Sequence, residues 1–474
     1  MTATGSDPKQ IRMNLFEMCC VSHITHGMWV HPENTRHRFN ELKYWLELAQ
    51  LLEYGTFDAL FLADVIGTYD TFRGGPETAL AEGMQIPNND PIMHVPAMAA
   101  VTDRLGFAVT CSTTYEPPFS FARRMSTVDH LTSGRIGWNV VTSYLPNAAR
   151  NFGYEDEVEH DNRYERADEY LEVVYKLWEG SWDDDAVLVD REHRVYTDPT
   201  KVHYINHDGR YFKVAGPHLS EPSPQRTPVI FQAGVSEAGR KFAGKHAEAI
   251  FLGGESVEQT RHFVEDIRGV ARSQGRDADD VKFFPSVNII VGRDADEVAK
   301  KVSDYERLRS VEGYLAHWDS RFDLTAYPRD TPIKTLADSR PDGERLTARF
   351  RRFQTVGEAL DSIGALNRPF SVAGTPDVVA DRLVEWVDTT GVDGFNVIQH
   401  LTPGTAQDVI ELVIPELRRR GRFRHAYDDD GPGTTLRERL FGTGQARLKP
   451  THPGAAFRNL ADTHPSSRSA SAEQ

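Results

Sequence analysis

The chain has 474 residues, of which 39% are hydrophobic, and its formal net charge is −16. The length and composition fit a globular protein with a sizeable core, and the negative charge argues against a nucleic-acid partner, whose phosphates require a basic surface. The three cysteines, Cys19, Cys20 and Cys111, provide no disulfide framework, so we expect a reducing, cytoplasmic location.

Short apolar runs alternate with longer amphipathic segments along most of the chain. We predict eight strands, at 11–18, 57–64, 107–115, 136–143, 228–234, 248–254, 283–292 and 393–399. Their apolar character is typical of parallel strands that are buried on both faces. Helices are predicted between them, among others at 38–54, 162–178, 256–274 and 405–420, with Gly55 and Gly180 as C-terminal caps. This alternation predicts an α/β protein with a (β/α)8 TIM barrel.

Three connections, at about 65–93, 181–226 and 311–372, are too long for simple loops. We expect them at the mouth of the active site, because long ordered loops in compact domains are usually functional. The second connection contains a predicted hairpin around residues 206–209. Residues 1–450 are predicted to form one domain, and 451–474 a poorly ordered tail or a segment that packs on a neighbouring subunit. No apolar stretch reaches the roughly 20 residues of a membrane helix, so we expect no membrane insertion.

Polar side chains stand at the ends of five successive predicted strands, where TIM barrels hold their active sites. They are Cys20 and His23 after the first strand, Asp64 at the second, Thr110, Ser112 and Thr113 in the third, Asn139, Thr142 and Ser143 in the fourth, and Gln232 and Ser236 at the fifth. Taken singly, each of them is most simply explained as a polar residue at the point where a loop begins. Their recurrence on five strands indicates a shared pocket.

Residues 232–244 have the pattern of a strand, a glycine turn and a helix that begins at Ser236. Serine is a good N-cap, and the first N–H groups of a helix bind anions. Arg240, one turn further on, adds a positive charge. The segment suits the phosphate of a cofactor, although an ordinary capped helix is the simpler interpretation. Neither GxGxxG nor a Walker A motif is present, so nucleotide binding by those routes is not indicated.

Three histidines, His23, His26 and His31, lie close together near the start of the chain. Their spacing matches no standard zinc-ligand pattern, so we predict histidines that line a pocket or face solvent, and no metal site. A metal-dependent hydrolase barrel is the alternative, which metal analysis of the purified protein would test.

Long stretches of the chain match one family of flavin enzymes. They include FEMCCVSHITHGMWVHPENTRHR, FDALFLADVIGTYD, RRMSTVDHLTSGRIGWNVVTS, EPSPQRTPVIFQAG and GFNVIQHLTPG. From about residue 11 to 460 the sequence resembles the nitrilotriacetate monooxygenase-like branch of the bacterial-luciferase superfamily. Within that branch it is most similar to the long-chain alkane monooxygenases and then to the dimethyl-sulfide monooxygenases. The resemblance implies a luciferase-like TIM barrel with insertions.

The resemblance also implies the oxygenase half of a two-component monooxygenase. Such enzymes receive reduced FMN from a separate NAD(P)H-dependent flavin reductase, form a flavin peroxide with dioxygen, and transfer one oxygen atom. It further implies a homodimer or tetramer and a small apolar substrate, first a long-chain alkane that yields a primary alcohol. Oxygenation of an organosulfur compound such as dimethyl sulfide, deazaflavin-dependent hydride transfer and a non-enzymatic flavin carrier are the alternatives.

Two sets of site residues follow from the resemblance, residue by residue. The cofactor contacts that the resemblance implies are Asp64, Thr110, His160, Tyr164 and Ser236, with Tyr164 and Ser236 at the phosphate. Asn139, Thr142 and Tyr144, at the end of the fourth predicted strand, complete the predicted cofactor set. The catalytic pocket set is Cys20, His23, Tyr69, Gln85 and His317, in which histidine or tyrosine serves as general acid and Cys20 lines the pocket without acting as a nucleophile. Tyr144 replaces a histidine of the alkane enzymes and matches a tyrosine of the dimethyl-sulfide enzymes, which leaves the substrate open.

Overall fold

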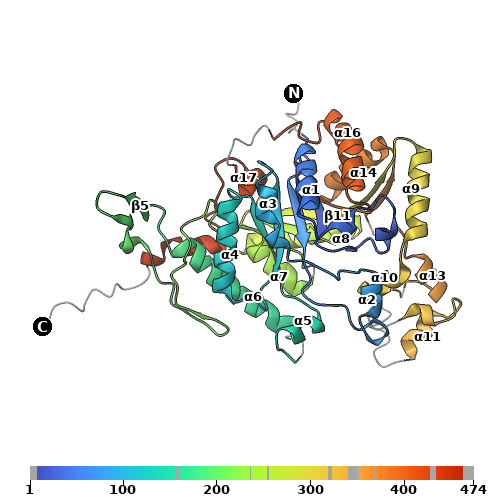
Figure 1. The fold of residues 1–474 in the computed structure, drawn as a ribbon, viewed down its shortest axis with the longest axis horizontal. Helices are drawn as coiled ribbons and strands as arrows, with labels where there is room; N and C mark the ends of the chain where they lie inside the picture. The colour runs from blue at the N-terminus through green and yellow to red at the C-terminus, as the bar shows by residue number, and fades with distance from the viewer. Residues whose placement is uncertain are drawn as a thin grey trace.

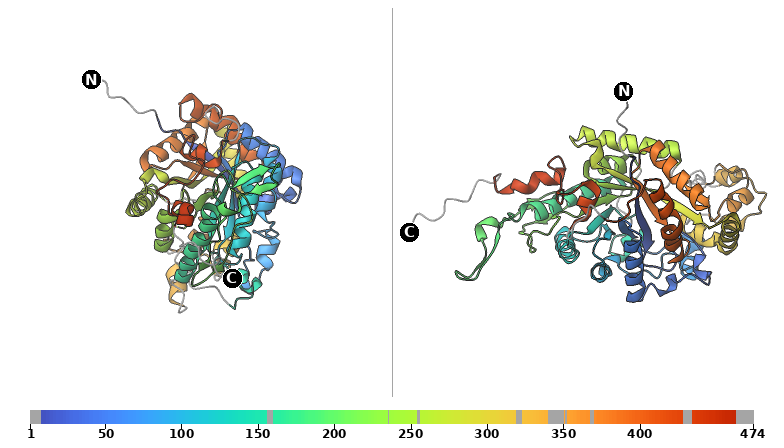
Figure 2. Two further views of the ribbon diagram at one scale, coloured as in Figure 1. Left: turned by 90° about the vertical axis from the view of Figure 1, so that its left-hand side faces the viewer. Right: turned by 90° about the horizontal axis from the view of Figure 1, so that it is seen from above.

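The computed structural model describes residues 8–155, 160–234, 236–253, 256–318, 323–339, 350, 352–366, 370–427 and 434–462. Within these residues, eight parallel strands form a closed barrel with helices around its outside (Figures 1 and 2). The barrel strands are β1 (Arg12–Met18), β2 (Ala59–Ala63), β3 (Gly106–Ser112), β4 (Ile136–Val141), β9 (Val229–Gln232), β10 (Ala249–Leu252), β11 (Lys282–Val291) and β13 (Gly394–Ile398). They follow one another in this order, and β13 pairs with β1 to close the ring. The predicted TIM barrel is confirmed.

All eight predicted strands are present, with ends that differ from the prediction by at most three residues. A further strand, β12 (Ser371–Gly374), pairs with the end of β11 and was missed. It is only four residues long and mostly half-buried, so it lacks the apolar run that marks the other strands.

The outer helices of the barrel occupy the connections between the strands. They are α1 (Leu42–Tyr54), α3 (Val95–Ala99), α4 (Pro118–Leu131), α5 (Pro146–Asn151), α6 (His160–Tyr175), α7 (Glu237–His246), α8 (Val257–Ser273), α9 (Ala295–Leu308), α14 (Pro376–Thr390), α15 (Gly404–Asp408) and α16 (Ile414–Arg419). None of the helices in the described part of the chain is long and apolar enough to cross a membrane.

Two of the predicted helices contain π-helical turns that the sequence did not indicate. Helix α6 continues into the turn Lys176–Gly180, and Val409–Val413 joins α15 to α16. Gly180 is therefore the last residue of a π turn and not a cap beyond the helix, which corrects the prediction. Gly55 is the C-cap of α1, as expected.

Aromatic rings fill the interior of the barrel. Phe16, Phe61, Phe231 and Phe251 pack against one another with ring centroids 4.7 to 5.7 Å apart. The barrel is thus a packed core and not a pore, as is usual for this fold. The space for ligands lies above these rings, at the carboxyl ends of the strands.

A short helix near the end of the chain, α17 (Leu436–Phe441), closes the opposite end of the barrel. Leu436 and Leu440 join the cluster of Phe61 and Phe231 beneath the strands. Arg437, on the same helix, is fully buried. It donates two hydrogen bonds to the Glu248 carboxylate, of 2.7 and 2.9 Å, and one to the carbonyl oxygen of Thr227, of 2.8 Å. These contacts fix α17 as the floor of the barrel.

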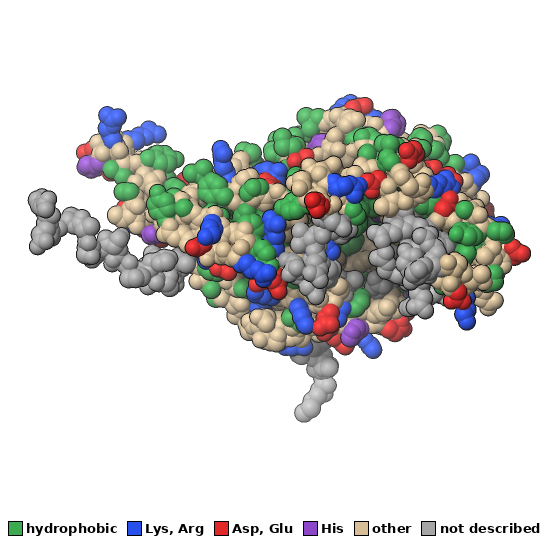
Figure 3. All heavy atoms as spheres, turned by 90° about the horizontal axis from the view of Figure 1, so that it is seen from below, with side chains coloured by type: hydrophobic (Ala, Val, Ile, Leu, Met, Phe, Trp, Pro, Cys, Tyr) green, Lys and Arg blue, Asp and Glu red, His purple; other side chains and the backbone are tan. Residues whose placement is uncertain are grey.

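Two of the three long connections build a layer over the mouth of the barrel. Residues 65–93 contain α2 (Glu77–Ala81), and residues 311–372 contain α10 (Val311–Trp318), α11 (Ile333–Asp338) and α13 (Val356–Asp361). Tyr69, Phe72, Leu315 and Ile333 share one hydrophobic cluster, which joins the two connections below the barrel in Figure 1. Figure 3 shows this side of the molecule, where acidic and basic side chains are mixed.

The third connection, 181–226, lies elsewhere, and the expectation that it surrounds the mouth is wrong. It forms the hairpin of β5 (Val187–Asp190) and β6 (Val195–Thr197), which projects from the body in Figure 1, and the pair β7 (His207–Asp208) and β8 (Lys213–Val214). The predicted hairpin is therefore present, but its turn is at 209–212 and not at 206–209. Phe212 packs on Tyr170 of α6, which explains why the segment follows the outer helices.

Part of the predicted tail is ordered. Residues Pro453–Asp462 form a 3-10 helix (η10), and His452 is buried against the ring of Tyr175 and bonded to the carbonyl oxygen of His246 at 2.8 Å. The expectation of a poorly ordered segment is corrected here, because these contacts bury the start of the tail. Residues 463–474 lie outside the described part of the chain.

Candidate active site

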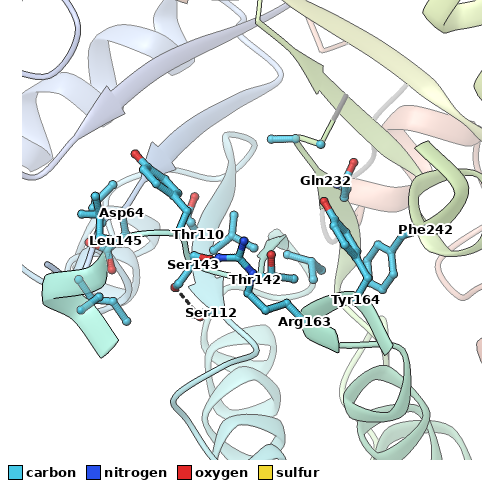
Figure 4. A pocket seen from close by; sticks show the side chains of 18 residues that line it. Asp64, Thr110, Ser112, Thr142, Ser143, Leu145, Arg163, Tyr164, Gln232 and Phe242 are labelled. Carbon is cyan, nitrogen blue, oxygen red and sulfur yellow. Dashed lines mark hydrogen bonds between the residues drawn. The ribbon is translucent and has the colours of Figure 1, made fainter. Parts of the chain in front are cut away.

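The carboxyl ends of β2, β3, β4 and β9 surround two adjoining cavities. The first has a volume of about 340 Å³ and the second about 620 Å³. The first cavity is lined by Asp64, Thr110, Thr142, Ser143, Tyr144, Arg163, Tyr164, Gln232 and Phe242, among others (Figure 4). The second is lined by Gln85, Asn88, Asp90, Tyr115, Glu116, Arg124 and Phe152, among others, and shares Asp64, Thr110 and Ser112 with the first. Both volumes are in the range of small-molecule sites.

Hydrogen bonds between neighbouring strands position the polar side chains at the base of the first cavity. Asn139 and Thr110 lie in register on β4 and β3, and the Asn139 amide donates to Thr110 Oγ1 at 2.8 Å. One step further out, the Ser112 and Ser143 hydroxyls are 2.7 Å apart. Gln232 is buried, and its Oε1 has no hydrogen-bond partner within the described residues. Because the Gln232 side chain lines the first cavity, a small rotation of its amide would let a bound ligand satisfy this oxygen.

The start of α7 lies next to Gly234 and Tyr164, which line the first cavity, although Ser236 itself is not part of the lining. Ser236 is the N-cap of α7, and its hydroxyl oxygen accepts from the Gly239 N–H at 3.1 Å. A Cβ at Gly234 or at Gly239 would lie 2.9 Å from the hydroxyl oxygen of Tyr164, so glycine lets this phenol approach the helix start. A helix N-terminus with an adjacent hydroxyl donor is suited to an anion.

Arg163 adds a positive charge that the sequence analysis missed. Its Nη1 donates to the carbonyl oxygen of Ser143 at 2.7 Å, which holds the guanidinium along the first cavity (Figure 4). Arg240, which the sequence analysis considered for this role, instead pairs with Asp266 of α8 at 2.5 Å and lies over the ring of Phe263. The structure thus places the guanidinium of Arg163, from α6, in the lining of the first cavity beside Ser143.

Asp64 borders both cavities at the end of β2. It accepts a hydrogen bond of 2.9 Å from the Asn88 amide. Burial raises the pKa of Asp64 to about 6, although the bond from Asn88 opposes this shift. The carboxyl group consequently changes its charge close to neutral pH.

Three of the five predicted catalytic residues come together beside the cavities. The Tyr69 hydroxyl is 2.5 Å from that of Tyr144, and the Tyr69 ring lies 5.0 Å from the ring of His317. Gln85 lines the second cavity, and its Nε2 is 3.3 Å from His317 Nε2. Tyr144, predicted in the cofactor set, lines the first cavity and so connects this group to it.

Cys20 and His23 lie deeper than the cavity walls. The backbone of Cys20 pairs with that of Asn88, and burial raises the pKa of the Cys20 thiol to about 12, so the thiol stays protonated. The ring of His23 packs edge-on against Phe16, with centroids 4.5 Å apart. His160 is the first residue of α6, and its side chain lies outside the described part of the chain.

The histidines near the start of the chain contact different residues. His26 Nε2 is 2.9 Å from His317 Nδ1, and the ring of His31 faces Tyr305. Across the residues that the structure describes, no group of three or more His, Cys, Asp or Glu side chains is placed to hold a metal ion.

Comparisons with known proteins cover nearly the whole chain. Residues 17–394, which include both cavities, match the family described as luciferase-like monooxygenase. A long-chain alkane monooxygenase of Geobacillus thermodenitrificans is 53% identical over 95% of this chain and 99% of that protein. A dimethyl-sulfide monooxygenase of Hyphomicrobium sulfonivorans is 48% identical over 95% and 94%. A crystal structure of a riboflavin lyase with modified FMN and riboflavin has a TM-score of 0.85 and 40% identity, and covers 95% of this chain and 100% of that one.

Proposed function

The chain belongs to the luciferase-like monooxygenase family, and from this premise we propose that it is the oxygenase component of a two-component system. It receives reduced FMN from a separate NAD(P)H-dependent flavin reductase and uses dioxygen to oxygenate an apolar compound. The first cavity carries this proposal, because its wall combines Arg163 with buried polar groups and the start of α7 lies beside it.

FMN fits the first cavity by the chemistry of its lining. Arg163, Tyr164 and the start of α7 would hold the phosphate, since each supplies donors or positive charge. Thr110 and the unpartnered amide oxygen of Gln232 would bind the polar atoms of the remaining flavin. When bound, reduced FMN supplies the electrons that activate dioxygen.

Exclusion of water is the task of the layer over the mouth. Tyr69, Leu315 and Ile333 belong to the cluster that joins the connections 65–93 and 311–372 above the site. A closed, dry site favours transfer of oxygen to the substrate over loss of the activated oxygen to water. Tyr69, Tyr144 and His317 form the neighbouring polar group that would hold or move a proton during transfer.

We propose a long-chain alkane as substrate, with its terminal carbon oxidised to a primary alcohol. Two relatives, by their names, act on long-chain alkanes and on dimethyl sulfide. An alkane offers no hydrogen-bonding group, so its binding rests on burial, at about 0.8 kcal/mol per CH2. The stacked rings of Tyr115 and Phe152, 4.5 Å apart beside the second cavity, supply apolar surface. An organosulfur substrate is second, because Tyr144 replaces a histidine of the alkane enzymes. We also propose a homodimer or tetramer.

Coupled turnover tests the function and the substrate together. The protein is incubated with a flavin reductase, NADH, FMN and a panel of alkanes, sulfides and sulfones, and products are identified by mass spectrometry. Terminal alcohols from alkanes support the first assignment. Sulfide or sulfone oxidation without alkane oxidation moves the assignment to the second substrate class. Absence of any oxygenated product, with hydride transfer from a reduced deazaflavin instead, would overturn the monooxygenase proposal.

A further inference from the structure

His26 lies directly behind His317, and the proposed function assigns it no role. His26 Nε2 and His317 Nδ1 are 2.9 Å apart, and the two ring centroids are 5.1 Å apart. His26 follows β1, whereas His317 is part of α10 in the layer over the mouth. Both side chains are buried, with exposed fractions of 7% and 8%. This contact therefore joins the barrel to the layer through two buried polar groups.

The contact with Gln85 indicates which nitrogen of His317 carries a proton. The Gln85 Nε2 lies 3.2 Å from the carbonyl oxygen of His23, which can only accept. The amide nitrogen of Gln85 must therefore be on this side, and an amide nitrogen only donates. The same nitrogen is 3.3 Å from His317 Nε2, so that Nε2 is an acceptor and bears no proton.

The proton positions on both histidines follow from this acceptor. A neutral imidazole with a bare Nε2 carries its proton on Nδ1, so His317 Nδ1 donates to His26 Nε2. His26 Nε2 in turn accepts, which leaves the proton of His26 on Nδ1. The hydrogen bonds thus run in one direction, from Gln85 through His317 to His26.

His26 also lines a small polar cavity on the outer side of the pair. The cavity has a volume of about 30 Å³, which is enough for one or two water molecules. Its polar lining is formed by Thr25, His26, Asn288, Tyr305, Arg309, Ser310, Tyr314 and His400. Asn288 Oδ1 is buried there without a hydrogen-bond partner within the described residues. Arg309 and Tyr314 are half-buried, so the cavity reaches towards the surface.

We propose that His26 is a positioning residue that holds His317 as the Nδ1–H tautomer and provides its proton exit. Once the hydrogen bond from Gln85 to His317 Nε2 is broken, a proton taken up at this nitrogen is matched by release of the Nδ1 proton to His26 Nε2. His26 then releases its own Nδ1 proton to the polar cavity, so each N–H bond formed is balanced by one broken. In this arrangement His317 is poised to accept a proton, whereas the sequence analysis assigned it to a general acid.

The tautomer of His317 can be read directly, without substrate or flavin. Nitrogen-15 NMR of the ring nitrogens, assigned by comparison with His317→Gln, is recorded for the wild type, His26→Leu and His26→Gln. We expect a protonated Nδ1 and a bare Nε2 in the wild type and in His26→Gln, whose amide oxygen still accepts. In His26→Leu the Nδ1–H loses its acceptor and only the 3.3 Å contact with Gln85 still favours this tautomer, so the signals should shift part of the way towards the other tautomer. His31→Leu, which removes a nearby histidine outside the pair, should leave them unchanged.

Turnover provides the second readout and rests on the proposed function. With reductase, NADH, FMN and hexadecane, His26→Leu should lower kcat by roughly 10- to 100-fold, by analogy with the loss when the partner that orients a metal-bound histidine is removed. KM should change little, and His26→Gln should restore most of the rate. A wild-type His317 protonated on Nε2, or a His26→Leu protein with an unaltered tautomer, would overturn the proposal. A wild type that oxygenates no substrate, with the NMR result as expected, would instead count against the proposed function alone.

Discussion

Replacement of Gly239 by alanine should weaken FMN binding without disturbing the fold. The new Cβ would lie 2.9 Å from the Tyr164 hydroxyl oxygen and 3.0 Å from the carbonyl carbon of Gly234. The phenol and the turn would have to move by roughly 0.5 Å to restore an ordinary carbon–oxygen contact. The Gly239 N–H is retained, so its bond to Ser236 remains possible.

The magnitude follows from the hydrogen bond that the phenol would lose. A hydrogen bond to a charged group contributes about 1.5–3 kcal/mol, which corresponds to a roughly 10- to 150-fold higher Kd. Tyr164→Phe removes the same hydroxyl and should raise the Kd by a similar factor. Because the closest contact is with that hydroxyl, Gly239→Ala should have a smaller effect in the Tyr164→Phe background, where only the contact with Gly234 remains.

Anaerobic titration with reduced FMN, followed by calorimetry, measures the four Kd values of this cycle. Gly269→Ala in α8 is the matched control, since its Cβ would meet no atom within 4 Å. That variant should keep its flavin affinity and gain about 0.5–1 kcal/mol of stability from the loss of a helical glycine. Wild-type affinity in Gly239→Ala, or full additivity of its effect with that of Tyr164→Phe, would refute the placement of the phosphate.

Three further predictions concern the cofactor site, the barrel floor and pH. Ser236→Asp should fold normally, since aspartate is a good N-cap. It should bind FMN at least about 10-fold more weakly, because it adds a negative charge beside the phosphate. Unchanged affinity would place the phosphate elsewhere. Arg437→Met should cost about 3–5 kcal/mol in chemical denaturation, because it leaves Glu248 buried without its partner; a loss below 1 kcal/mol would show that water reaches the floor. Asp64 has its pKa raised from 3.8 to about 6, so its contribution to stability is lost as the pH rises through about 6. The Tm of Asp64→Asn minus that of the wild type, both without flavin, should therefore increase between pH 5 and 8, and a constant difference would contradict the assignment.

The barrel could be predicted from the sequence because its strands are buried on both faces. Runs such as 57–64 and 283–292 have no polar face, and this pattern with intervening helices has few other solutions. The π turn at Lys176–Gly180 could not be predicted, because no local pattern marks it; in the structure it packs against η10, a distant segment of the chain. The position of residues 181–226 away from the mouth could not be predicted either, because the sequence of a hairpin does not indicate the element against which it packs.

Only part of the candidate site followed from local patterns. Ser236 was identified because an N-cap after a strand and a glycine turn is a local feature. Arg163 was missed because an arginine in an amphipathic helix usually faces solvent, and only the fold brings it beside Ser143. The contact between His26 and His317 spans 291 positions of the chain, so no local pattern could reveal it.

The floor helix α17 has a consequence for how the protein is made. Leu436 and Leu440 complete a core whose other members include Phe61 and Ala108, more than 300 residues earlier. During synthesis the strands emerge from the ribosome long before the helix that covers their ends. Until then the underside of the barrel exposes apolar surface, which makes the nascent chain prone to aggregation and a candidate for chaperone binding. Ribosome release before residue 441 should therefore yield an insoluble product, whereas release after residue 462 leaves the floor intact.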